Sequence, residues 1–283
     1  MIQTAYEEDK IMLKIIVLIK QVPGTQKVQV DPKTGSLIRK GFENITNPDD
    51  LHGLELALQL KDKYGADITV ISMGPLQAKD SLYEAQSLGA DSAVLVSDPS
   101  LSGSDTWVTS KVLVKAIEKI GKFDLIICGV EAIDGNTGQV PYQISESLKI
   151  PLITQINEIK LEDAEKSDEI KSFFIDRIKG HEKQQIRVRT PFLITANKYL
   201  NEIRFPNLLN VKKALEKQIK VWTCEDIAIK SEETGLKGSL TEVILMDVVS
   251  HKRKNEIIEG SLSDISKKII EILRNANLFT KIK

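Results

Sequence analysis

The stretch Leu125–Val140, LIICGVEAIDGNTGQV, guides the interpretation of the rest of this 283-residue sequence. It passes from an apolar block directly into a loop of small and polar residues that contains three glycines. Such a loop after a buried strand is either a tight turn or a place where the backbone touches a charged ligand, because glycine permits close approach to the main chain. Both interpretations stay open from these residues alone.

Strand and helix patterns alternate on both sides of this stretch. Residues 13–19 (LKIIVLI) form a β-branched run typical of a parallel strand that is covered on both faces. Further strands are predicted at 67–72, 92–96 and 124–128, and helices at 51–64, 77–88, 105–120 and 139–148. Asn47 or an Asp after it is expected to cap the first helix. The alternation predicts an α/β fold with a doubly wound, mostly parallel sheet.

Other segments depart from this alternation. A polar hairpin is predicted at 26–40. After residue 155 the pattern favours antiparallel strands, including residues 186–189 and 192–195, with the polar residues 162–169 as a turn between strands.

A helix is predicted at 207–219, after which the strand–helix rhythm is lost. The segments 221–229 and 240–249 look extended, and residues 261–274 form an amphipathic helix that packs either on a second subunit or on its own domain. We therefore predict an N-terminal extension (1–11), an α/β domain with an antiparallel extension (12–220) and a C-terminal arm (221–283).

Composition limits the classes of function. Lys and Arg number 39 and Asp and Glu 40, so there is no basic footprint for nucleic acid or a membrane surface. Two cysteines make no disulfide framework, and three histidines far apart in sequence argue against a histidine-based metal site. Without a long apolar run or an N-terminal signal pattern, we expect no membrane insertion and a cytoplasmic location.

Candidate binding residues follow the predicted strands. Ligands of open parallel sheets lie beyond the carboxyl ends of the strands, here at residues 20–23, 72–75, from 97 onward and 129–140. Amide N–H groups at the start of the helix at 139–148 favour a phosphate. Thr137 and Gln139 add possible donors. Asp134 and Asn136 either hold the loop by side-chain-to-backbone bonds or, for Asp134, bind a ribose hydroxyl. No dinucleotide or Walker fingerprint is present, no residue has an evident catalytic arrangement, and a loop with a helix cap remains the alternative.

Six segments, in this order and spacing, resemble the small (beta) subunit of electron-transferring flavoproteins across residues 12–225. They are VLIKQVP (17–23), NPDDLHGLELALQLKDKYG (47–65), VISMGP (70–75), SLGADSAVLVSD (87–98), GVEAIDGNTGQVP (129–141) and TANKYLNEIRFPNLLNVKKA (195–214). The resemblance implies a heterodimer with a large (alpha) subunit that carries a flavin, while the small subunit holds a second adenine nucleotide.

The identity of that nucleotide separates two groups in the family. It is AMP in ordinary members and FAD in electron-bifurcating members, which exchange a hydride with NAD(H). The short loop at 132–141 resembles the bifurcating group and favours FAD, with AMP as the alternative. From another class, a stand-alone nucleotide-binding stress-type protein of similar fold would not need residues 190–283.

The resemblance also implies site residues. It assigns cofactor binding to Leu18, Ile19, Lys20, Gln21, Asn47, Asp50, Met73, Gly74, Gly129, Asp134, Gly135, Asn136, Thr137, Gly138, Gln139 and Val140. Residues 196–204 match the family's recognition loop for an FAD-dependent dehydrogenase of the acyl-CoA or 2-hydroxyacid type. In that loop Tyr199, Leu200, Asn201 and Glu202 are the predicted contacts, with Leu200 as an exposed apolar anchor.

Overall fold

The computed structural model describes residues 12–24, 29–30, 37–38, 43–162, 170–244 and 257–276. Packing divides the chain into two units, residues 1–244 and 245–283. The first unit contains the sheets, and the second contains helix α7 (Leu262–Asn275). Residues 1–11, with the predicted N-terminal extension, and most of the predicted turn at 162–169 lie outside the described residues.

The first unit is built on a parallel sheet of seven strands. In spatial order these are β14 (Lys220–Trp222), β7 (Ser92–Val96), β6 (Ala66–Met73), β1 (Leu13–Leu18), β8 (Leu125–Gly129), β13 (Phe192–Ala196) and β9 (Leu152–Ile153). Every neighbouring pair runs parallel, and Val17 of β1 lies opposite Val70 on one side and Ile127 on the other. The predicted α/β fold with a parallel sheet is confirmed.

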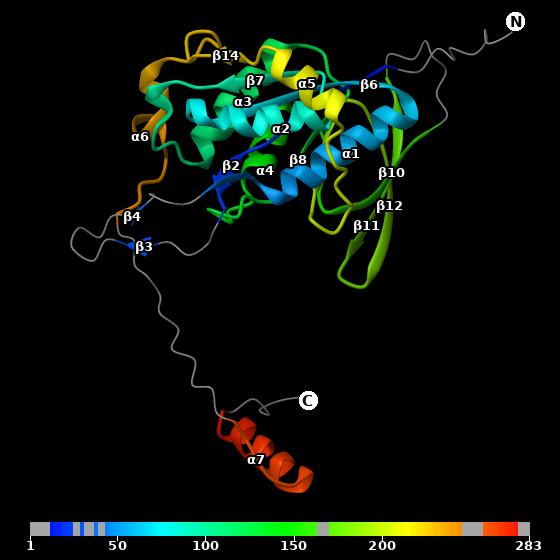
Figure 1. The fold of residues 1–283 in the computed structure, drawn as a ribbon, viewed down its shortest axis with the longest axis vertical. Helices are drawn as coiled ribbons and strands as arrows, with labels where there is room; N and C mark the ends of the chain where they lie inside the picture. Colours follow the sequence, from blue (N-terminus) through cyan, green and yellow to red (C-terminus); the bar gives the residue numbers. More distant parts are fainter. Residues whose placement is uncertain are drawn as a thin grey trace, which may run out of the picture. The chain divides into compact units, whose positions relative to one another are not determined.

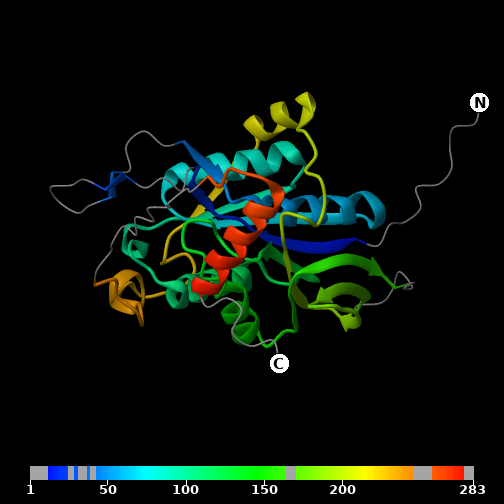
Figure 2. The same ribbon diagram turned by 90° about the horizontal axis from the view of Figure 1, so that it is seen from below.

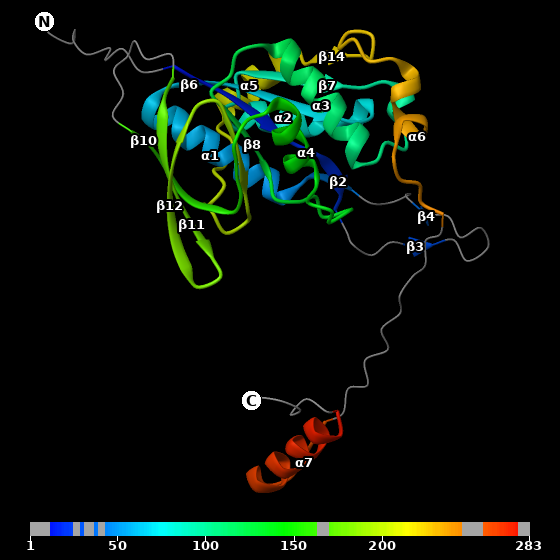
Figure 3. The same ribbon diagram turned by 180° about the vertical axis from the view of Figure 1, so that it is seen from behind.

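Helices cover both faces of this sheet, as Figure 1 and Figure 3 show from opposite sides. The helices α1 (Pro48–Tyr64) and α2 (Lys79–Leu88) share one apolar core with Ile15 and Val17 of β1. On the other face, α3 (Thr106–Ile120) and α4 (Val140–Leu148) share a second core with Ile16 and Leu18. Because alternate side chains are buried on both faces, β1 has the continuous apolar sequence of a central parallel strand.

Smaller elements complete the first unit. Helix α5 (Leu208–Glu216) contacts the outside of α2, as Figure 2 shows, and the short helices are η1 (Leu76–Ala78), η2 (Pro99–Leu101), η3 (Ser231–Glu233) and α6 (Gly235–Gly238). A three-stranded antiparallel sheet consists of β10 (Ile156–Leu161), β11 (Ser172–Lys179) and β12 (Glu182–Arg189). It joins the first core through Phe173, whose ring meets that of Phe192 edge-on with centroids 5.3 Å apart.

Two antiparallel pairs lie near the N-terminus. Strand β2 (Gln21–Pro23) pairs with β5 (Asn44–Thr46). Strand β3 (Gln29–Val30) pairs with β4 (Leu37–Ile38), which confirms the hairpin predicted at 26–40 where the structure describes it.

Two sequence predictions about strands were wrong. Residues 192–195 are not antiparallel; they form β13, which lies parallel between β8 and β9. All five of its residues are buried, and such continuous burial is typical of a central parallel strand. Nor is the strand–helix rhythm lost at residue 220, because α5 leads into β14, which extends the sheet beside β7. The predicted extended segment at 221–229 stops at Trp222, and residues 224–228 form a turn.

The strand order changes direction between β1 and β8. Helix α1 leaves β1 on one face, whereas α4 leaves β8 on the opposite face. At such a switch point the two connections diverge and leave room beyond the carboxyl ends of the strands, which is the usual ligand position in open α/β sheets.

A buried ion pair joins the antiparallel sheet to the residue before β8, at the edge of the parallel sheet where β8 begins. Lys171 Nζ lies 2.9 Å from Asp124 Oδ1, and the two side chains are only 13% and 12% exposed. We expect Lys171→Met to lower the free energy of unfolding by about 3–5 kcal/mol, because it leaves the Asp124 carboxylate buried without its cation. Urea denaturation measures the change.

The matched control is Lys149→Met, whose pair with Glu146 is 75% and 79% exposed. This substitution should leave the free energy of unfolding nearly unchanged, because exposed ion pairs are weak. Equal effects of the two substitutions would contradict a structural role for the Lys171–Asp124 pair.

Candidate functional site

The first turn of α1 holds the ends of β1 and β8 together through Asp50. Its Oδ2 accepts a hydrogen bond from Lys20 N at 2.8 Å, and its Oδ1 accepts one from Gly129 N at 2.9 Å. The carboxyl group is buried, with 7% of the residue exposed. Gly129 is needed for this approach, because a Cβ there would lie 2.4 Å from Asp50 Oδ1. One carboxyl group thus bridges the two strands at the switch point.

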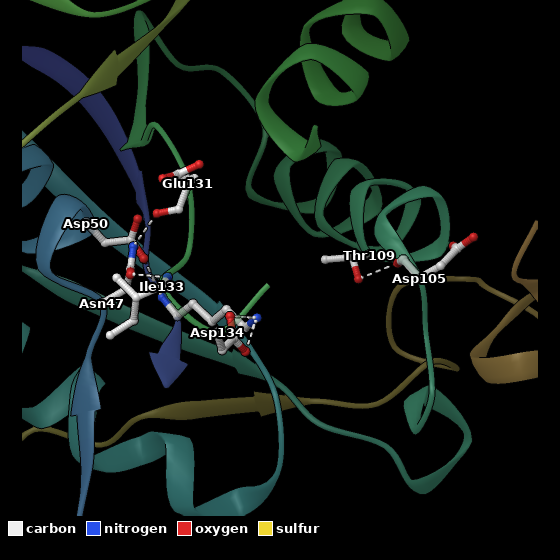
Figure 4. Close-up of polar contacts among 8 residues, drawn as sticks. Asn47, Asp50, Asp105, Thr109, Glu131, Ile133 and Asp134 are labelled. Carbon is white, nitrogen blue, oxygen red and sulfur yellow. Dashed lines mark hydrogen bonds and ion pairs between the residues drawn. The ribbon is translucent and has the colours of Figure 1, made fainter. Parts of the chain in front are cut away.

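Asn47 holds the loop that follows β8. Its Nδ2 donates to Glu131 O at 2.9 Å, and its Oδ1 accepts from Ile133 N at 3.1 Å. Asn47 occupies the N-cap position of α1, as predicted, but its side chain makes no capping bond. The amide is engaged with the loop instead, as Figure 4 shows.

Asn47 and Asp50 and the residues that they bond form one cluster, and Lys20 and Asp134 make an ion pair on its exposed side. Lys20 Nζ lies 2.8 and 2.7 Å from the two carboxylate oxygens of Asp134. Asp134 therefore holds the loop through a side-chain ion pair, not through the side-chain-to-backbone bond that was one of the predictions. An exposed pair of this kind contributes little stability, so a competing anion can separate it at low cost.

Asn136 and Gly138 shape the tip of the loop, where both have left-handed backbone angles, with φ of 49° and 59°. The Asn136 side-chain amide, with its nitrogen toward the loop, donates to Ile133 O and Ala132 O. The amides of Gly135 and Asn136 bond to Ala132 O. The loop is therefore folded on itself, as the prediction for Asn136 required.

The next amides have no partner in the part of the chain that the structure describes. No hydrogen bond is formed there by the main-chain N–H of Thr137, Gly138, Gln139 or Val140. Val140 begins α4, and Gln139 at its N-cap position makes no side-chain capping bond. Four successive free donors at a helix N-terminus favour an anionic group.

The start of α3 adds polar side chains that the sequence interpretation missed. Thr106 Oγ1 donates to Gln139 Oε1 at 2.8 Å, and Gln143 Nε2 donates to Thr106 Oγ1 at 3.3 Å. Asp105, at the helix cap, lies apart from the Asn47–Asp50 cluster in Figure 4 and bonds Val108 N, Leu240 N and Thr241 N. The sequence predicted that this helix begins at residue 105, soon after the strand at 92–96. Its start was therefore expected near the carboxyl ends of the strands, and that position could have identified Thr106.

The remaining predicted cofactor residues fall near the same edge. Leu18 ends β1 and Ile19 follows it, and Gln21 Nε2 donates to Gln77 O at 3.1 Å, just beyond β6. Met73 ends β6, and Gly74 N donates to Val96 O at 3.0 Å. Since β6 is the neighbour of β1 in a parallel sheet, these residues flank the cluster, while Thr137 and Gly135 lie in the exposed loop.

Burial shifts the pKa of two groups at this site, Asp50 and Cys128. It raises the pKa of Asp50 to about 7, although the hydrogen bonds from Lys20, Asn47 and Gly129 lower it. Burial, with the charge of Asp50 beside it, also raises the pKa of the thiol of Cys128, a buried residue of β8. Among the described residues, no group of His, Cys, Asp or Glu is arranged to hold a metal ion.

The predicted recognition segment is residues 196–204, of which Ala196 is the last residue of β13 and residues 197–204 follow that strand. Tyr199 is 83% exposed, and Lys198 Nζ lies 5.2 Å from the centre of its ring. Leu200 is half-buried against the first core, so the expectation that it is exposed was wrong, while its contact with a partner stays a prediction. Its main-chain N–H donates to Asn197 O at 3.1 Å.

Comparison with known proteins assigns the family. A model described as "Electron transfer flavoprotein domain" matches residues 34–227. The "Electron transfer flavoprotein subunit beta" of Thermoanaerobacterium thermosaccharolyticum is 40% identical over 267 residues, covering 94% of this chain and 100% of that protein. This chain belongs to the electron transfer flavoprotein family.

Two other family members carry more specific names. "Caffeyl-CoA reductase-Etf complex subunit CarD" of Acetobacterium woodii is 38% identical over 268 residues, covering 94% of this chain and 100% of that protein. "Protein FixA" of Azotobacter vinelandii is 39% identical over 254 residues, covering 88% and 89%. These matches confirm the resemblance to electron transfer flavoprotein beta subunits and place the chain in a flavoprotein family of electron transport. Among the described residues, no helix is long and apolar enough to cross a membrane.

The raised pKa of Asp50 has a consequence for stability. Between about pH 4 and pH 7 this carboxyl is ionised in the unfolded chain and protonated in the folded one, given a shift from 3.8 to about 7. Folding then takes up a proton, so the free energy of unfolding contributed by this group falls as pH rises through that window, by at most about 1.4 kcal/mol per unit.

Asp50→Asn cannot titrate, and we expect its stability to change less between pH 4 and pH 7 than that of the wild type. Urea denaturation at several pH values measures both profiles. Parallel profiles would show that Asp50 does not carry the perturbed pKa.

Proposed function

We propose that this chain is the small subunit of a heterodimeric electron transfer flavoprotein and binds FAD at the switch point between β1 and β8. FAD bound there would take a hydride from NADH, or return one to NAD, and exchange electrons with a flavin of the large subunit and with a partner dehydrogenase. The observation that carries the proposal is the row of free amides at residues 137–140.

These amides fit the diphosphate of a dinucleotide. The positive end of the α4 dipole lies at Val140 and favours negative charge there. Lys20 stands across the loop, paired with Asp134, and its ammonium can turn to a phosphate oxygen in place of that carboxylate. Asn47 and Asp50 are already bonded to the backbone, so in this proposal they position the loop and do not contact phosphate.

The shape of the loop supports FAD over AMP. Its backbone folds back through the bonds of Gly135 and Asn136 to Ala132 O, and side chains 134–137 are exposed. A loop this compact leaves space beside the phosphates where a ribityl chain could continue. AMP remains the second candidate, because a single phosphate would satisfy part of the same donor row.

The two partner surfaces of the proposal lie on different units. Tyr199, Asn201 and Glu202 belong to the segment proposed to meet an FAD-dependent dehydrogenase. In the second unit, the described part of the chain leaves apolar side chains of α7 exposed, including Leu262, Ile269 and Ile270. We propose that this helix, as part of the C-terminal arm, packs on the large subunit.

Nucleotide content tests the proposal. We expect the heterodimer, purified with its large subunit and denatured, to release two FAD per heterodimer and no AMP, as measured by chromatography of the extract. NADH should bleach the visible flavin spectrum of the intact complex.

One FAD with one AMP would support the AMP candidate and exclude the two-flavin proposal. Purification of this chain as a stable monomer that needs no partner, with a nucleotide other than FAD, would favour the stand-alone nucleotide-binding protein.

A further inference from the structure

The loop at residues 130–139, here called the nucleotide loop, begins beside the recognition segment at residues 197–204. Strands β8 and β13 are paired through their last residues, with Gly129 opposite Ala196. Val130 N then donates to Ala196 O at 3.1 Å. The loop at 130–139 continues from one strand and the segment at 197–204 from the other, so both depart from the same point of the sheet edge.

Helix α1 bonds to both of them. Asn47 and Asp50 hold the nucleotide side through Glu131, Ile133 and Gly129. On the recognition side, Asp49 Oδ1 accepts from Lys198 N at 3.0 Å. Adjacent residues of one helical turn therefore contact the two segments.

Two more residues of α1 continue the row on the recognition side. The main-chain oxygen of His52 accepts from Asn201 Nδ2 at 3.0 Å, and His52 Nδ1 lies 2.9 Å from Asn201 Oδ1. Glu55 accepts from Arg204 Nε at 2.8 Å and from Arg204 Nη2 at 3.0 Å. Since Asp49, His52 and Glu55 are three residues apart, they lie along one face of the helix.

The Glu55–Arg204 pair is the strongest of these ties. Glu55 is only 4% exposed, and the guanidinium meets its carboxylate with two donors. Loss of Arg204 would leave a buried carboxylate without its partner. At the same time, α1 lies close against both strands, because a Cβ at Gly53 would be 3.1 Å from Ile127 and 3.6 Å from Ala196. The helix has little room to move independently of either strand end.

We propose that Asp49, His52 and Glu55 are positioning residues that hold segment 197–204 in the conformation a partner protein meets, and that through α1 the order of this segment follows occupancy of the nucleotide site. This inference rests on the proposed nucleotide-binding function. It assigns to α1 a role in both the binding of nucleotide and the presentation of Tyr199 to a partner.

Hydrogen exchange of the full chain, measured by mass spectrometry with and without saturating FAD, tests the inference. We expect FAD to slow exchange at least severalfold in residues 129–140 and also in residues 197–204. In Arg204→Met, FAD should still protect 129–140 but no longer protect 197–204. If Arg204 had a purely structural role, its loss would raise the exchange rate of residues 197–204 by the same factor with and without FAD, and the protection by FAD would remain.

Controls keep the outcomes separate. Arg189→Met removes an exposed arginine from β12 and should behave like the wild type. If Arg204→Met does not fold, Asn201→Ala removes the two contacts with His52 and should give the same loss of FAD-dependent protection.

Protection confined to 129–140 in the wild type would overturn the inference while leaving the proposed function intact. Unchanged protection of 197–204 in Arg204→Met would also overturn it. No protection at 129–140 with either FAD or AMP would mean that the proposed function itself fails, and this inference with it.

Discussion

The site depends on one buried carboxyl group between two strand ends. Asp50 accepts hydrogen bonds from the main-chain N–H of Lys20, just after β1, and from that of Gly129, the last residue of β8. These are the two strands from which the chain leaves to opposite faces. They pair directly through residues 15–17 and 125–127, and the carboxyl group continues that connection beyond the paired residues. The glycine at 129 is required because any larger residue would occupy the position of the carboxylate. A helix start, a strand end and a loop are therefore set by a single contact.

The same contact gives α1 more than a packing role. Its first residues determine where the loop at 130–139 lies, and the face with Asp49, His52 and Glu55 contacts the segment proposed to meet a dehydrogenase. In a protein whose chemistry belongs to bound cofactors, the chain contributes position, access and electrostatics. A helix that contacts both loops would relate the proposed cofactor site to the proposed partner surface directly.

Much of this arrangement could be predicted from the sequence. Apolar runs and glycine breaks located strands β1, β6, β7 and β8 and helices α1 to α4 to within a few residues, and the polar loop after Cys128 identified the edge of the candidate site. The parallel direction of β13 and β14 was not predictable locally, because it depends on which distant strand each one joins. Local sequence patterns also could not predict side-chain contacts between distant residues, since Arg204 and Glu55, which form an ion pair, are 149 residues apart. The packing of Leu200 against the first core likewise depends on distant residues that local sequence does not show.

The affinity of the assembled complex for FAD, measured after replacing the glycines of the loop, tests the central claim that the bend at 134–140 holds a diphosphate. Gly135→Ala has space in the nucleotide-free chain, since the nearest atom to a new Cβ is 4.0 Å away, whereas Gly138 has a φ of +59° that disfavours alanine. The account predicts that both substitutions weaken FAD binding about tenfold or more, Gly135→Ala without loss of stability in the free chain. Gly180→Ala, at a similar φ of +62° in a remote turn, should leave affinity unchanged. Full FAD affinity in Gly135→Ala and Gly138→Ala would contradict the account.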